Sequence, residues 1–147
     1  MAISIHAIIA DLASNPRKIF LIDGIGAFVT TLLLSTILAP FSNFFGMPQA
    51  ILYLLATVAF FYTLYSLSCF YFIPQKWQFC LSIILVANIF YCCLTTGFIF
   101  YYYPTLTKLG LIYFILEIAI MTQLILIEYQ TIRLSFQNNQ TTKSHEK

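Results

Sequence analysis

The stretch LTKLGLIYFILEIAIMTQLILIE, residues 106–128, places one carboxylate, Glu117, near the centre of a long apolar run. A helix of about 20 apolar residues crosses the ~30 Å hydrocarbon layer of a membrane. Three similar runs precede this one in the chain. The sequence therefore predicts four transmembrane helices, at about residues 19–39, 48–73, 77–103 and 106–128.

The composition of the whole chain also indicates a membrane protein. Of its 147 residues, 61% are hydrophobic and 8% are charged, whereas soluble domains average roughly 25% charged residues. Between Ile19 and Ile127 the only acidic or basic side chains are Asp23, Lys76, Lys108 and Glu117. We therefore expect one all-α transmembrane domain, residues 16–137, with the lipid bilayer as its partner. The net charge of +2 is too small to indicate nucleic-acid binding.

Short connections at residues 41–47, 74–76 and 104–105 join the four runs. Such links make neighbouring helices antiparallel, which predicts an up-down-up-down four-helix bundle with both termini on one side. Lys108 then lies opposite the other six basic residues, which are Arg17, Lys18, Lys76, Arg133, Lys143 and Lys147. Because basic residues are enriched on the cytoplasmic side, both termini are predicted to be cytoplasmic.

The two ends of the chain differ from the apolar runs. In residues 1–15, Ile5, Ile8 and Leu12 recur at helical spacing, which predicts a short amphipathic helix at the membrane interface. This segment has no basic start, and Asp11 interrupts its apolar stretch, so it does not resemble a signal peptide. Residues 138–147 are polar and charged and are predicted to form a disordered tail.

Polar side chains at matching depth predict a site inside the bundle. Aligning the midpoints of the four runs places Thr30, Tyr62, Asn88 and Glu117 at one level, one on each helix. Tyr65 and Tyr91 follow Tyr62 and Asn88 at a spacing of three, which puts them on the same helix faces. The candidate intramembrane polar site therefore consists of Thr30, Tyr62, Tyr65, Asn88, Tyr91 and Glu117.

Glu117 has two interpretations, because a charged group at the bilayer centre costs at least a few kcal/mol. In the first, the carboxyl group is protonated and hydrogen-bonds Asn88 or a tyrosine, which stabilises the bundle. In the second, it binds a proton or cation in a transporter, as intramembrane carboxylates often do. Lys108 lies near the non-cytoplasmic end of this helix, on the face opposite to Glu117, so we do not expect the two side chains to pair.

Asp23 and Glu128 form a second candidate polar site, on the cytoplasmic side. Both lie near the cytoplasmic ends of their helices, where two neighbouring carboxyl groups could share a proton. An ordinary helix-end role is the alternative, in which Asp23 reaches the interface or pairs with Arg17 or Lys18.

Motifs for catalysis and for cofactor or metal binding are absent from the sequence. His6 and His145 lie outside the apolar runs, which argues against a haem held by paired histidines. The four cysteines are not spaced as Cys-x-x-Cys and are interpreted as small apolar side chains: Cys69, Cys80, Cys92 and Cys93. We therefore expect no cofactor and no enzymatic activity.

Five segments of the chain carry a further pattern: KIFLIDGIGA (18–27), FGMP (45–48), YSLSC (65–69), ANIFYC (87–92) and GLIYFILE (110–117). Together they resemble a group of small four-span bacterial integral membrane proteins with no assigned activity. The resemblance covers about residues 17–128 and implies a four-span fold in the bacterial inner membrane. Small multidrug exporters share this size, but they carry their essential glutamate in the first span rather than the fourth.

Three functional hypotheses follow from the sequence. The first is a membrane protein without enzymatic activity that acts through its own oligomer or through a membrane partner. The second is a proton-coupled transporter or channel for small solutes that uses Glu117 and forms a dimer or larger oligomer. The third is a membrane-embedded enzyme that uses Asp23 and Glu128.

Overall fold

The computed structural model describes residues 15–72 and 75–145, with side chains as far as Ser135 except that of Pro16. Its described part is helical and contains no strand. The elements are α2 (Pro16–Leu32), the π-helical segment η1 (Leu33–Leu38), α3 (Ser42–Phe45), α4 (Gln49–Phe72), α5 (Trp77–Tyr101) and α6 (Lys108–His145). The predicted interfacial helix of residues 1–15 lies almost entirely outside the described residues.

Four of these helical stretches are long and apolar enough to cross a membrane. They are Arg17–Leu38, Gln49–Phe72, Trp77–Tyr101 and Lys108–Ser135. Their positions confirm the four predicted runs to within a few residues, except at the end of the last one. Proline sets several of these limits: Pro16 occupies the first turn of α2, and Pro48 directly precedes α4. The protein is therefore an all-helical membrane protein by the length and composition of its helices.

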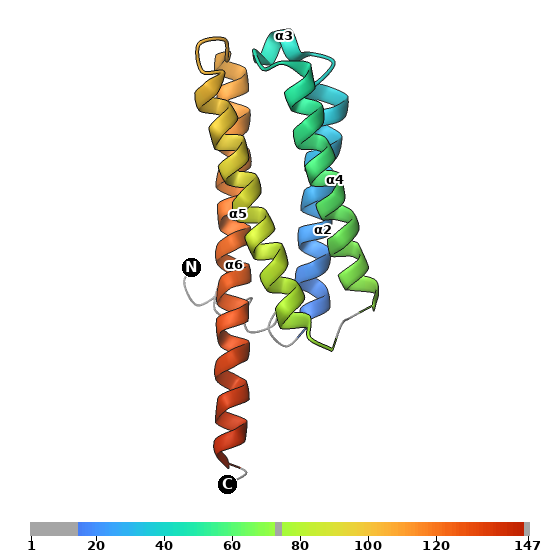
Figure 1. Cartoon of the computed structure of the whole chain (residues 1–147), viewed down its shortest axis with the longest axis vertical. Coiled ribbons are helices and arrows are strands. Elements are labelled where there is room, and N and C mark those ends of the chain that lie inside the picture. The colour runs from blue at the N-terminus through green and yellow to red at the C-terminus, as the bar shows by residue number, and fades with distance from the viewer. Residues whose placement is uncertain (1–14, 73–74, 146–147) are drawn as a thin grey trace.

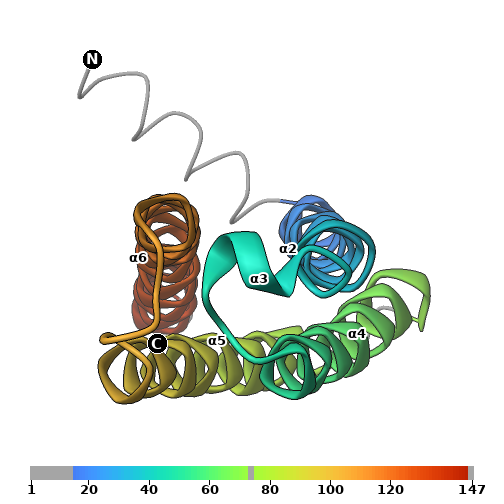
Figure 2. The same ribbon diagram turned by 90° about the horizontal axis from the view of Figure 1, so that it is seen from above.

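The four long helices form two hairpins that lie side by side (Figure 1). The chain passes along α2, back along α4, forward along α5 and back along α6. The closest packing is within each hairpin, α2 against α4 and α5 against α6, and α4 also contacts α5. α2 and α6 are not a closely packed pair, and the view along the bundle shows them apart on one side (Figure 2).

α6 is longer than the sequence predicts. The transmembrane run was expected to end near Glu128, and residues 138–147 were predicted to be disordered, but α6 continues to His145. The helix therefore extends into the segment that was predicted to be a disordered tail. Neither Gly nor Pro interrupts the sequence after Gly110, and extending an existing helix adds one hydrogen bond for each residue that it fixes. Polar composition alone does not end such a helix.

Two loops meet at one end of the bundle, here called the loop end. Thr107 donates its backbone N–H to the carbonyl of Phe45 at 3.2 Å and its hydroxyl to the carbonyl of Phe44 at 2.6 Å. Gly46 ends α3 in the left-handed conformation, with a φ of 73°. A Cβ on Gly110 would overlap the carbonyl oxygen of Phe45. These contacts bring the start of α6 against α3 and close the bundle at this end.

The buried side chains form two apolar clusters. The larger lies toward the loop end and includes Leu34, Leu52 and Phe114, while the smaller, toward the opposite end, includes Phe20 and Leu81. Along each of the four long helices a buried polar residue separates the two clusters: Asp23 on α2, Ser66 on α4, Asn88 on α5 and Glu128 on α6. A polar layer therefore crosses the apolar core.

Candidate functional site

Asn88 is the centre of this polar layer. Its side-chain amide donates to Oδ1 of Asp23 at 2.9 Å and to Oε1 and Oε2 of Glu128 at 3.1 and 3.3 Å. The hydroxyl of Ser66 donates to Oδ2 of Asp23 at 2.5 Å. The four side chains, which we call the carboxyl-pair cluster, thus join all four transmembrane helices by hydrogen bonds.

Asp23 and Glu128 also lie within hydrogen-bonding distance of each other. Their side chains are 2% and 0% exposed, so both carboxyl groups are inside the bundle rather than at its surface. No basic side chain among the described residues contacts either group. Two carboxyl groups hydrogen-bond each other only when one of them carries a proton. The structure thus brings the predicted cytoplasmic-side pair together, and a proton on one carboxyl group would let it donate to the other.

Glu117 lies nearer the loop end, apart from that pair. The hydroxyl of Tyr91 donates to its Oε1 at 2.9 Å. Its Oε2 is buried without a hydrogen-bond partner among the described residues, and the side chain is 7% exposed. Of the two partners expected for Glu117, the structure supplies the tyrosine and not Asn88.

A small cavity lies between the carboxyl-pair cluster and Glu117. Its lining includes Thr30, Tyr62, Asn88 and Tyr91, one or two residues from each of α2, α4 and α5, and Met121 from α6. Its volume is about 10 Å³, close to the space that one water molecule needs. The structure thus places four predicted site residues around one cavity. Glu117 is connected to it through Tyr91.

Tyr65 does not belong to this interior site, contrary to the prediction. It is 37% exposed, and its hydroxyl lies beside Cys69 and Cys80. The buried face of α4 carries Thr63 and Ser66 instead. Because α4 is apolar on all sides, the spacing of its polar residues does not determine which face is turned inward.

Two buried serines were not among the predicted site residues. Ser66 shares a helix face with Tyr62 and is the only link from α4 to the carboxyl-pair cluster among the hydrogen bonds of the described residues. Ser135 accepts a hydrogen bond from the side-chain amide of Gln78 near the opposite end of the bundle. Serine is common in transmembrane helices, so neither position is distinctive in the sequence alone.

A groove of about 380 Å³ lies between α2 and α6. Gly26, Val29 and Leu33 line one wall, and Leu116 and Ile120 line the other. Glu117 is part of the second wall. The other polar groups of the groove are the hydroxyl groups of Thr30 and Tyr113. A carboxyl group thus lies in an apolar groove of a size typical for small-molecule sites.

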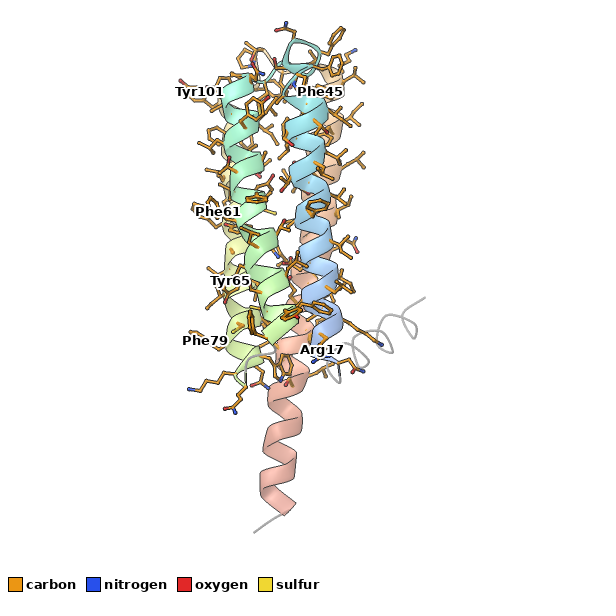
Figure 3. The ribbon with its side chains drawn as sticks, turned by 90° about the vertical axis from the view of Figure 1, so that its right-hand side faces the viewer. Arg17, Phe45, Phe61, Tyr65, Phe79 and Tyr101 are labelled. Atoms are coloured by element: carbon orange, nitrogen blue, oxygen red, sulfur yellow. The ribbon has the colours of Figure 1, made fainter. Side chains whose placement is uncertain are left out.

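The site contains no arrangement suited to a metal ion. Among the side chains described in residues 15–72 and 75–135, no three His, Cys, Asp or Glu residues come together in a group that could hold a metal ion. The ends of the bundle carry charged and aromatic side chains, with Arg17 and Phe79 at one end and Phe45 and Tyr101 at the other (Figure 3). The buried carboxyl groups therefore dominate the chemistry of the interior.

Comparison with known proteins finds no match for the chain. No protein-family model matches the chain. No curated protein and no solved structure matches it either.

Proposed function

We propose that the protein is a proton-coupled transporter of small solutes, without enzymatic activity, in the bacterial inner membrane. One observation supports this proposal above the others. Three carboxyl side chains, Asp23, Glu117 and Glu128, are buried within transmembrane helices without a basic partner among the described residues. Carboxyl groups in such positions bind and release protons in many membrane transporters.

The energetic balance favours a functional role for these groups. A charged side chain at a helix centre costs about 3 kcal/mol on membrane-insertion scales. Hydrogen bonds between transmembrane helices average only about 0.6 kcal/mol. Amide and hydroxyl side chains would join the helices at a lower cost than three carboxyl groups, so holding the bundle together does not by itself account for them.

Polar groups link the carboxyl centres to each other by hydrogen bonds. Glu117 accepts from Tyr91, Tyr91 and Asn88 line the small cavity, and Asn88 donates to Asp23 and Glu128. A single water in that cavity would connect Tyr91 with the carboxyl-pair cluster. We propose that this chain of hydrogen bonds couples the protonation of Glu117 to that of the carboxyl pair.

The small cavity has no room for a solute, so transport requires a larger space elsewhere. We propose that two copies of the chain associate to form the pathway, with both termini in the cytoplasm. This orientation in the membrane is inferred from the six basic residues that lie on the same side of the bundle as the two termini.

The decisive experiment is proton flux into liposomes that contain the full-length protein and an internal pH indicator. With a pH gradient and a potassium diffusion potential imposed, we expect wild type to move protons faster than empty liposomes. Glu117→Gln should reduce that flux to the level of empty liposomes, because the side-chain amide does not bind and release protons at the pH values of the assay. Thr122→Val is the matched control, since the Thr122 side chain is exposed on the same helix. Equal flux in wild type and Glu117→Gln would contradict the proposal.

A second candidate is a non-enzymatic membrane protein that acts through its own oligomer or a membrane partner. The carboxyl-pair cluster favours it, because one side chain from each of the four long helices takes part and the cluster would hold the bundle together. On this hypothesis Asp23→Asn would lower the unfolding temperature in detergent, and wild type would carry no proton flux under any gradient.

A further inference from the structure

Glu117 presents an unsatisfied hydrogen-bonding position beside the α2/α6 groove. Tyr91 occupies its Oε1, and its Oε2 has no partner among the described residues. A buried carboxyl oxygen without a partner costs free energy, and the hydrocarbon around the groove supplies no water to satisfy it. A bound molecule with a hydrogen-bond donor would therefore stabilise this oxygen.

The rest of the groove specifies the other part of that molecule. Its walls are mostly carbon, and Val29, Leu116 and Ile120 are exposed on the outer surface of the bundle, where lipid would lie. A ligand would reach such a groove from the bilayer and would cover its walls with an alkyl chain. The volume of about 380 Å³ suits a single chain better than a large amphiphile.

We propose that the groove binds an amphipathic ammonium cation, whose N–H group donates to Oε2 of Glu117 and whose alkyl chain lies between α2 and α6. The inference rests on the proposed proton-coupled function and names its substrate class. A cation fits because no basic side chain lines the groove within the described residues, so the ligand supplies the positive charge that pairs with the carboxylate.

Binding exchanges one proton for the cation. The O–H bond of protonated Glu117 breaks, and the proton is released from the bundle to the aqueous solution. The carboxylate that remains accepts the ammonium N–H at Oε2 while Tyr91 continues to donate to Oε1. The site is neutral before and after the exchange, so neither state leaves an unpaired charge in hydrocarbon. Met121 lines both the small cavity and the groove, and its flexible side chain allows the carboxyl group to turn toward the ligand.

The test uses the full-length protein in phosphatidylcholine nanodiscs and n-decylammonium as the probe. In weakly buffered solution, adding the probe to wild type should release protons beyond the amount released by Glu117→Gln nanodiscs. The probe should also raise the unfolding temperature of wild type in a concentration-dependent way, because it binds only the folded protein. Equal proton release and equal thermal shifts in the two proteins would overturn the inference.

A second variant locates the ligand while keeping Glu117 intact. A Cβ on Gly26, which lines the groove, would meet nothing within 4 Å. Gly26→Leu should therefore fold, fill the groove and weaken decylammonium binding by roughly tenfold or more. Gly97 on α5 is equally open but is not part of the groove, so Gly97→Leu is the matched control and should bind as wild type does. Unchanged binding by Gly26→Leu would place the ligand elsewhere and refute the proposed site.

Two further probes separate the parts of the ligand. n-Decanol has the same chain without a charge and should release no proton, and decyltrimethylammonium has the charge without an N–H and should bind roughly tenfold more weakly. Equal binding of decanol and decylammonium would overturn the assignment of a cation. A wild type that is dimeric and a Gly26→Leu variant that is monomeric would show that a second copy of the chain fills the groove instead.

The binding test is independent of the flux test. Proton flux without decylammonium binding would remove the groove site and leave the proton-coupled function. Decylammonium binding with proton release but without flux would keep the site and remove the transport function.

Discussion

At the scale of single residues, Tyr91 supplies the only hydrogen bond that Glu117 accepts among the described residues. Tyr91→Phe removes the donor to Oε1 and leaves both oxygens of the buried carboxyl group without a partner among the described residues. We expect the free energy of unfolding in detergent to fall by about 1–2 kcal/mol. Tyr129→Phe, an exposed position on α6, is the control and should change stability by less than about 0.5 kcal/mol. Equal losses in the two variants would show that the hydrogen bond to Glu117 contributes nothing.

Replacing Asn88 should lower stability more than replacing Tyr91, because the Asn88 amide donates hydrogen bonds to two carboxyl groups. Asn88→Leu deprives Asp23 and Glu128 of their amide donor. We expect a loss of about 2–3 kcal/mol in the free energy of unfolding, measured by denaturant titration in mixed micelles. Gln123→Leu makes the same chemical change at an exposed position of α6 and should be nearly neutral. An Asn88→Leu protein as stable as wild type would show that the hydrogen bonds of this amide do not stabilise the bundle.

The sequence identified the residues of the interior better than their partners. Glu117 was evident because a charge in a long apolar run is rare, and Asp23 and Glu128 were evident for the same reason. The pairing of Asn88 was not predictable, since aligning midpoints treats every span as straight and centred. α6 extends well beyond its expected end, and α5 is inclined relative to it (Figure 1). Asn88 therefore meets Glu128 rather than Glu117.

At the scale of elements, the contact between α3 and the start of α6 predicts a difference between two glycines. Gly110→Ala would place a Cβ against the carbonyl oxygen of Phe45, a backbone atom that cannot move without displacing α3. We expect it to lower the unfolding temperature. Gly97→Ala adds the same methyl group where nothing lies within 4 Å, and it should be neutral or slightly stabilising because alanine favours helix.

Circular dichroism melts of the two variants in the same detergent give the comparison. A Gly110→Ala protein that melts at or above the Gly97→Ala protein would mean that the loop end tolerates separation of α3 from α6. The four helices themselves were predictable from the length of the apolar runs. This loop contact was not, because neither the conformation of Gly46 nor the hydrogen bonds of Thr107 leave a pattern in the sequence.

At the scale of the whole molecule, the distribution of basic residues predicts the topology in the membrane. In a background without native cysteines, Gln75→Cys should be protected from a membrane-impermeant thiol reagent added to intact cells. Thr105→Cys, at the loop end, should react. Both positions are exposed, so a difference in labelling reports their side of the membrane. The reverse labelling pattern would place both termini outside the cytoplasm.

The central claim is that the buried carboxyl groups exchange protons with water rather than staying permanently neutral as structural links. Infrared difference spectroscopy of the full-length protein in lipid measures this directly, through the carbonyl stretch of protonated carboxyl groups while the external pH is changed. We predict bands that appear and disappear reversibly with pH, one missing in Glu117→Gln and another missing in Glu128→Gln. A carbonyl region that does not change with pH in the folded wild type would contradict the account.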